Sequence, residues 1–176
     1  AALASALAGD AARLARTRDL TQAGAILLIG NDPTHNHPLL AYNIRAAVRQ
    51  QGAHLYIVNH RWVKLERQAR QIVRVPAGGE STAVELLLDQ PASLPPDARE
   101  GLASLRAALE KEKDVVVLFG AELTGTAVAR LVEFGNKLPG KTRYIALGDY
   151  ANSHGAADLG LVPDRLPGYA RIDDPA

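Results

Sequence analysis

The 176-residue sequence predicts an α/β domain of three layers, in which a mostly parallel five-stranded sheet lies between two layers of helices. Short apolar runs alternate with amphipathic segments along the chain, and this alternation is typical of a doubly wound, Rossmann-like sheet. Two of the runs, residues 25–29 and 115–119, each end at a glycine, Gly30 and Gly120. We expect these two strands to begin the two halves of the sheet and to lie side by side, which gives the order 3-2-1-4-5.

The first half begins with one βαβ unit, residues 24–58. A polar loop, residues 31–37, follows the first strand. Pro38 is expected to open the helix, because the first helical position needs no N–H donor. Gly52 is the expected end of that helix, and residues 54–58 form the second strand. The crossover between the two parallel strands should be right-handed.

The remaining elements follow from the same periodic patterns. We expect helices over residues 1–16, 62–70, 80–88, 97–109 and 123–138, and strands over residues 72–75, 115–119 and 144–147. Asp97 is expected to cap its helix together with Glu100, three residues on. Residues 1–147 would then form the α/β domain with its leading helix. Residues 148–176 are rich in glycine and proline and are expected to form an irregular tail that packs on the same domain.

Composition narrows the classes of function. Hydrophobic residues make up 47% of the chain and charged residues 22%, as in an ordinary globular domain. The net charge is +1, and no basic stripe with interleaved aromatics is visible, which argues against a nucleic-acid partner. No apolar run approaches the roughly 20 residues that a membrane span needs, so we expect no direct membrane insertion. Without cysteine, this sequence cannot ligate an iron–sulfur cluster through thiolates. The lack of methionine suggests a fragment of a longer protein.

Residues 135–142 match the phosphate-binding pattern G-x-x-x-x-G-K-T. That loop must leave a strand and open a helix, so that backbone N–H groups meet the phosphates. Here it leaves a predicted helix and enters a predicted strand, and Pro139 lacks an N–H. We therefore interpret the motif as a helix end followed by a turn.

Other ligand patterns are incomplete. The loop after the first strand lacks the dinucleotide fingerprint G-x-G-x-x-G, and the second strand ends at Asn59 where an acidic residue would hold a ribose. His35 and His37 could begin a metal site, but a third ligand would have to come from a distant loop. A polar loop is the simpler interpretation. Arg61, Asp149 and Asp158 could bind anions or transfer protons, but surface and capping roles are the simpler interpretation.

Three segments together resemble a known family. Residues 29–38, Ile-Gly-Asn-Asp-Pro-Thr-His-Asn-His-Pro, resemble the G-x-N-P-x-x-x-H-P loop of molybdopterin oxidoreductases such as formate dehydrogenases. Residues 58–61, Val-Asn-His-Arg, stand where that family has Asp-Pro-Arg. Residues 152–163 resemble its N-x-x-G-A-x-D-x-G-x-x-P segment. This last segment is most similar to the large, G-type subunit of respiratory NADH:quinone oxidoreductase (complex I), which carries no molybdenum.

The resemblance assigns the family's cofactor-binding positions to loops at one edge of the sheet: Gly30, Asn31, Pro33, His37, Asn59, Arg61, Gly120, Asn152, Gly155 and Asp158. The family holds guanine with an Asp at the position of Asn59 and with a Pro-Gly-Thr-Asp segment at residues 76–82. An asparagine cannot offer guanine two charged acceptor oxygens. The resemblance therefore implies a vestigial site. We also expect the tail to cross this crevice and to bring Asn152 and His154 near Gly30 and Gly120; the alternative is a disordered linker to a further domain.

Two functions follow from the resemblance. The first is a non-catalytic scaffold module of an iron–sulfur G-type subunit, with no cofactor of its own and with iron–sulfur clusters elsewhere in the subunit. Its partners would be other domains of that subunit and other subunits of a respiratory complex, in a cytoplasmic arm at the inner face of the cell membrane. The alternative is a working module that binds molybdopterin guanine dinucleotide in a formate dehydrogenase-like oxidoreductase.

Overall fold

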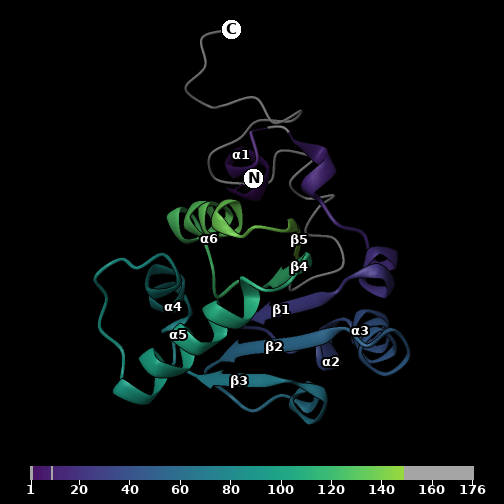
Figure 1. Ribbon diagram of the computed structural model, residues 1–176, viewed down its shortest axis with the longest axis horizontal. Coiled ribbons are helices and arrows are strands. Elements are labelled where there is room, and N and C mark those ends of the chain that lie inside the picture. Colours follow the sequence, from purple (N-terminus) through teal and green to yellow (C-terminus); the bar gives the residue numbers. More distant parts are fainter. Residues whose placement is uncertain (1, 9, 149–176) are drawn as a thin grey trace, which may run out of the picture. The chain divides into compact units, whose positions relative to one another are not determined.

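Five parallel strands form a single sheet in the computed structural model, in the order β3-β2-β1-β4-β5 (Figure 1). The structure describes residues 2–8 and 10–148. The strands are β1 Ala25–Ile29, β2 His54–Asn59, β3 Gln71–Arg74, β4 Asp114–Phe119 and β5 Lys141–Ala146. The predicted fold class and strand order are confirmed.

Helices cover both faces of the sheet (Figure 1). The helix α3 (Pro38–Gln51) packs on one face together with the 3-10 helices η2 (Thr17–Gln22) and η3 (Lys64–Gln68). The other face carries α1 Ala2–Ala6, α4 Glu80–Leu87, α5 Pro96–Leu109 and α6 Thr126–Lys137. Two short elements complete the fold, η1 Ala11–Arg13 and α2 Pro33–Asn36. Within the described residues, no helix has the length and apolar character that a membrane span requires.

The strand β1 lies at the centre of the core, and all five of its residues are fully buried. Its side chains alternate between the two faces: Ile26 and Leu28 join the cluster under α3, while Leu27 joins the cluster under the other helices. Ile29, the last residue of β1, is aligned with Val58 on one neighbour and Phe119 on the other. Because the three central strands end at the same level, the loops that follow them meet at one edge.

The predicted N-terminal helix over residues 1–16 is wrong. Its first part forms the short α1, and the segment after it forms η1, which Asp10 caps by accepting the N–H of Ala12 at 3.1 Å. Beyond η1, the N–H of Ala15 donates to the carbonyl of Tyr144 at 2.9 Å, and Leu14 forms a parallel bridge with Tyr144. Pairing with the exposed edge of β5 therefore outweighs the helical propensity of this segment.

Several other boundaries differ from those predicted. The helix α5 begins at Pro96 rather than at a capping box of Asp97 and Glu100, since proline fits the first helical position and leaves Asp97 in the first turn. The helix predicted over residues 62–70 is reduced to η3, and α6 begins at Thr126 rather than at residue 123. The strand β5 begins three residues earlier than expected, at residue 141.

Candidate functional site

The loop after β1 turns sharply at the carboxyl edge of the sheet. Gly30 and Asn31 both have left-handed backbone angles, with φ of 61° and 58°. Such a conformation is uncommon for a residue with a side chain, and a short polar residue such as asparagine tolerates it best. The N–H of Gly30 donates to the carbonyl of Val58 at 2.8 Å, which ties the turn to the end of β2. Residues 31 and 32 are buried as a result.

Glu122 occupies the space between the glycine that ends β1 and the glycine that ends β4. Its Oε1 accepts the backbone N–H of Asn31 at 2.9 Å. A Cβ atom at Gly30 would lie 2.9 Å from the carboxyl carbon of Glu122. One at Gly120 would lie 2.5 Å from Glu122 Oε2 and 2.6 Å from Asn31 Nδ2. Both glycines are therefore needed to seat this side chain, and we call the contact of Glu122 with Asn31 the Glu122 plug.

Two acceptor atoms of the Glu122 plug have no hydrogen-bond donor. Oε2 of Glu122 and Oδ1 of Asn31 are buried, and neither meets a donor among the residues that the structure describes. A buried acceptor without a donor lowers the stability of the fold, so these two oxygens make the contact between the two loops less favourable. A negatively charged ligand brought to this point would face further acceptor oxygens.

The side chain of Asn59 connects the loops after β1 and β2 through hydrogen bonds to the backbone of both. Its side chain is fully buried; Nδ2 donates to the carbonyl of Asn31 at 2.8 Å, and Oδ1 accepts the backbone N–H of Arg61 at 3.1 Å. Both ends of the amide are therefore engaged inside the chain. An aspartate here could not donate to the carbonyl of Asn31.

A buried glutamate contacts a partly exposed histidine beside this amide. Glu80, the first residue of α4, accepts the N–H of His60 at 3.2 Å and contacts His60 Nδ1 at 2.6 Å. The Glu80 side chain is only 1% exposed, and its second oxygen finds no donor in the described part of the chain. From the sequence, Glu80 was only the first residue of a helix expected over residues 80–88. Its position at the end of the Pro-Ala-Gly-Gly turn was the available signal, because that turn directs the chain back toward the end of β2.

A pocket of about 430 Å³ opens next to these loops, lined by Asp32, His35, Asn36, Arg61 and Trp62. His35 and Arg61 therefore share one surface. Asp32 caps the short helix α2, and its Oδ1 accepts the N–H of Thr34 at 3.0 Å.

The other residues predicted to bind a cofactor do not all lie at this pocket. Pro33 is the buried first residue of α2, and His37 separates α2 from α3 without lining the pocket. No group of three or more metal-ligating side chains occurs within residues 2–8 and 10–148. The structure thus brings Gly30, Asn31, Asn59 and Gly120 together, with Arg61 nearby. Three predicted residues, Asn152, Gly155 and Asp158, lie outside the described residues, as does the predicted crossing of the tail.

The G-x-x-x-x-G-K-T motif leads from the end of α6 into β5, as expected, and opens no helix. A Cβ at Gly140 would lie 2.5 Å from the carbonyl oxygen of Lys113, so this glycine serves a close approach of two backbone segments. Glu122, like Glu80, is a residue of this edge that the sequence did not single out. The signal was an acidic residue two positions after Gly120, in the loop predicted to face Gly30.

Comparison with known proteins gives relatives of one kind, although no family model matches the sequence. The second G-type subunit (G 2) of the NADH-quinone oxidoreductase of Rhizobium meliloti (strain 1021) is 29% identical over 177 residues, which cover 86% of this chain and 21% of that protein. The probable oxidoreductase YjgC of Bacillus subtilis (strain 168) is 24% identical, over 89% of this chain and 20% of its own length. The putative formate dehydrogenase YrhE of the same bacterium is 23% identical, over 96% and 21%. The chain thus spans about a fifth of the length of these relatives.

A solved structure shares the fold. The formyltransferase/hydrolase complex FhcABCD from Methylorubrum extorquens, in complex with methylofuran, matches with a TM-score of 0.57 and 17% identity, over 98% of this chain and 52% of that one. The curated relatives confirm the resemblance drawn from the three sequence segments, to the G-type subunit of NADH-quinone oxidoreductase and to formate dehydrogenase-like proteins of the molybdopterin oxidoreductase family. They support an oxidoreductase-like module.

Proposed function

We propose that this chain is a non-catalytic scaffold module of the G-type subunit of an NADH:quinone oxidoreductase. The Glu122 plug is the observation that carries this proposal. It fills the switch point between β1 and β4, where doubly wound folds bind their ligands. The chain would keep the family's cofactor fold as a structural element, while the electron carriers lie in other parts of the subunit.

The residues at the switch point do not fit an anionic dinucleotide. The backbone N–H of Asn31, which a phosphate oxygen could use, already donates to Glu122. A phosphate would also approach the unsatisfied Oε2 of Glu122 in a site of low dielectric, where repulsion between like charges is strong. Accommodating the ligand would require the Glu122 side chain to leave, and with it the contact between the two loops.

Asn59 supports the same proposal. Its side chain is fully buried, and its amide is held by the carbonyl of Asn31 and the N–H of Arg61, so it is not presented to a guanine base. We propose that the partners of this module are other domains of its own subunit and other subunits of a respiratory complex. Its place would be the cytoplasmic arm at the inner face of the membrane. The G-type relative from Rhizobium meliloti supports this, since the chain spans only 21% of it.

Acid oxidation of the intact subunit tests the proposal, because it converts any bound pterin to a fluorescent product. We expect no pterin fluorescence above that of a protein blank, after correction for protein concentration. About one pterin per polypeptide would overturn the scaffold function. A formate dehydrogenase carried through the same oxidation is the positive control.

The second candidate is a working module for molybdopterin guanine dinucleotide. The pocket lined by His35, Arg61 and Trp62 favours it, because a cation and an aromatic ring beside β2 suit a nucleotide base and its phosphates. If this function holds, Asn59→Asp should tighten the binding of GDP measured by calorimetry. Absence of GDP binding in both the parent chain and the variant would contradict it.

A further inference from the structure

Exposed apolar side chains gather beside the pocket at α2. Leu39 is 77% exposed, Tyr42 is 64% exposed and Trp62 is 56% exposed, the three highest values among the large apolar side chains that the structure describes. Leu39 and Tyr42 lie on the outer face of α3, one turn apart. Trp62 lines the pocket together with Asn36, which ends α2 just before α3 begins. Leu39 follows Asn36 by three residues, and we call the three exposed side chains together with this pocket the Trp62 face.

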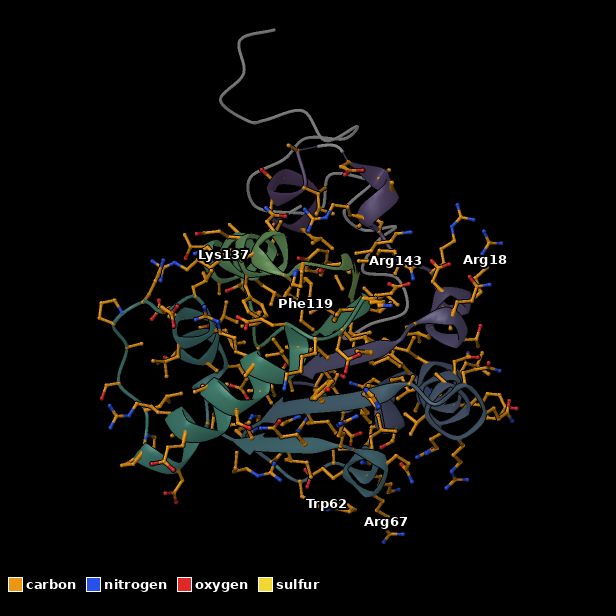
Figure 2. The ribbon with its side chains drawn as sticks, in the orientation of Figure 1. Arg18, Trp62, Arg67, Phe119, Lys137 and Arg143 are labelled. Carbon is orange, nitrogen blue, oxygen red and sulfur yellow. The ribbon has the colours of Figure 1, made fainter. Side chains whose placement is uncertain are left out.

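The elements that carry the Trp62 face are packed together. The helices α3 and η3 contact each other and share a hydrophobic cluster on the same side of the sheet. In Figure 2, Trp62, just before η3, and Arg67, within η3, both project outward at the lower edge of the molecule. Buried Val63 and Leu65 anchor the segment between them, so alternate residues are held in the core and the others are presented to solvent.

The Trp62 face is basic. Residues 38–79 contain seven basic residues and one acidic residue, and that acid, Glu66, pairs with Arg74 at 2.7 Å. Three of the basic residues beside Trp62 form no ion pair with any residue of the described part: Arg61, Lys64 and Arg67. Elsewhere several arginines are paired within the chain, for example Arg106 with Glu110 and Arg143 with Asp114.

The segment that follows, which contains α4, α5 and β4, carries the opposite charge. Residues 80–122 contain nine acidic and four basic residues. The net charge of +1 does not reveal this asymmetry. The basic residues form no periodic stripe in the sequence, because they are spread over a helix, a loop and η3, and the fold places them on one side.

We infer that the Trp62 face is a docking surface for an acidic protein surface, with apolar groups that cover Leu39, Tyr42 and Trp62. Tryptophan, tyrosine and arginine are the residues most enriched at the energetic centres of protein interfaces. Unpaired cations around such a centre select a partner with carboxylates and speed its association. A nucleic acid would use the cations but would leave Leu39 and Tyr42 uncovered. The inference rests on the proposed function, because a scaffold module needs a partner to hold.

Crosslinking in the purified oxidoreductase complex tests the inference. A photo-crosslinking phenylalanine derivative replaces Trp62, and in a matched control it replaces the exposed Ser104 on α5. We expect a crosslink from position 62, at least tenfold above that from position 104, to one polypeptide segment in which Asp and Glu outnumber Lys and Arg. Crosslinks to nucleic acid or lipid, to a basic segment, or at equal yield from both positions would overturn the inference.

Charge reversal gives an independent measurement. Arg61→Glu, Lys64→Glu and Arg67→Glu together should reduce the amount of chain retained in the complex at least tenfold, with an unchanged circular dichroism spectrum. Lys111→Glu, Lys113→Glu and Lys141→Glu change the net charge equally and should leave retention unchanged. Equal retention of the two triple variants would overturn the inference. If the parent chain is found in no complex, the proposed function fails as well, whereas a crosslink from another face within the complex overturns the docking surface alone.

Discussion

The phenolic oxygen of Tyr144 lies where a side chain at Gly135 would begin. A Cβ built on Gly135 would be 1.9 Å from that oxygen and 2.9 Å from Cγ2 of Thr142. Glycine inside a helix normally lowers stability, but here it lets α6 approach β5 closely enough to bury Tyr144 completely. Arg13 donates to the same hydroxyl at 3.2 Å, and this contact links η1 to the edge of the sheet.

Gly135→Ala should therefore destabilise the fold, although the same change in an ordinary helix stabilises it. We expect the free energy of unfolding in urea to fall by about 1–3 kcal/mol, as for other overpacked core positions. The matched control is Gly24→Ala, where the new Cβ meets its nearest atom at 3.4 Å, an ordinary contact. Combining Gly135→Ala with Tyr144→Phe should recover part of the loss. If Gly135→Ala and the double variant are equally stable, the hydroxyl of Tyr144 is not what the new methyl group collides with.

The burial of Tyr144 also predicts a loss of stability in alkali. Burial raises the pKa of Tyr144 to about 12, with Arg13 opposing the rise. The unfolded chain has the ordinary pKa of about 10 and releases its proton first, so this contribution is fully present below pH 10 and is lost as the pH rises toward 12. The full loss is about 2–3 kcal/mol. Denaturation at several pH values should show a shallower decline in Tyr144→Phe than in the parent.

The contact of Glu80 with His60 predicts that the stability of the fold is sensitive to substitution of Glu80. Glu80→Ala removes the acceptor of two hydrogen bonds and leaves a cavity beneath β2, so we expect a loss of about 2–4 kcal/mol in the free energy of unfolding. Glu85 serves as the control in the same helix, since its pair with Arg130 is partly exposed and Glu85→Ala should cost less than about 1 kcal/mol. Similar losses for the two variants would contradict the structural importance of Glu80.

The framework of the fold was predictable from the sequence, and its edges were not. The apolar runs that became β1 and β4 are buried on both faces, so composition alone distinguishes them. The segment around Leu14 and Ala15 was assigned to a helix because its partner, the edge of β5, is about 130 residues away in the chain. Local propensity carries no information about such a pairing.

Part of the candidate site was likewise predictable from the sequence, and part was not. The convergence of Gly30 and Gly120 followed from topology, because the carboxyl ends of adjacent parallel strands meet. The plug did not follow, since the side-chain direction of Glu122 depends on the two left-handed residues of another loop. The pairing of Glu80 with His60 likewise depends on how the turn before α4 is oriented.

Removal of the plug gives the sharpest prediction for the site. Glu122→Ala leaves the N–H of Asn31 without its acceptor and should cost about 1–2 kcal/mol in the free energy of unfolding. It also clears the space that Glu122 fills between Gly30 and Gly120 and removes a negative charge from it. The freed N–H then faces an open crevice at the end of β1, where an anion can replace the lost carboxylate.

Calorimetry with inorganic pyrophosphate measures this change directly. We expect no detectable binding to the parent chain and a Kd of about 1 mM or tighter for Glu122→Ala, which corresponds to about 4 kcal/mol. Glu133→Ala on α6 is the matched control, because it removes one exposed carboxylate far from the crevice and should bind no pyrophosphate. If both variants bind equally weakly, the crevice is closed by something other than Glu122. If the parent chain already binds pyrophosphate, the carboxylate does not exclude anions, and the case for a scaffold without a cofactor loses its main support.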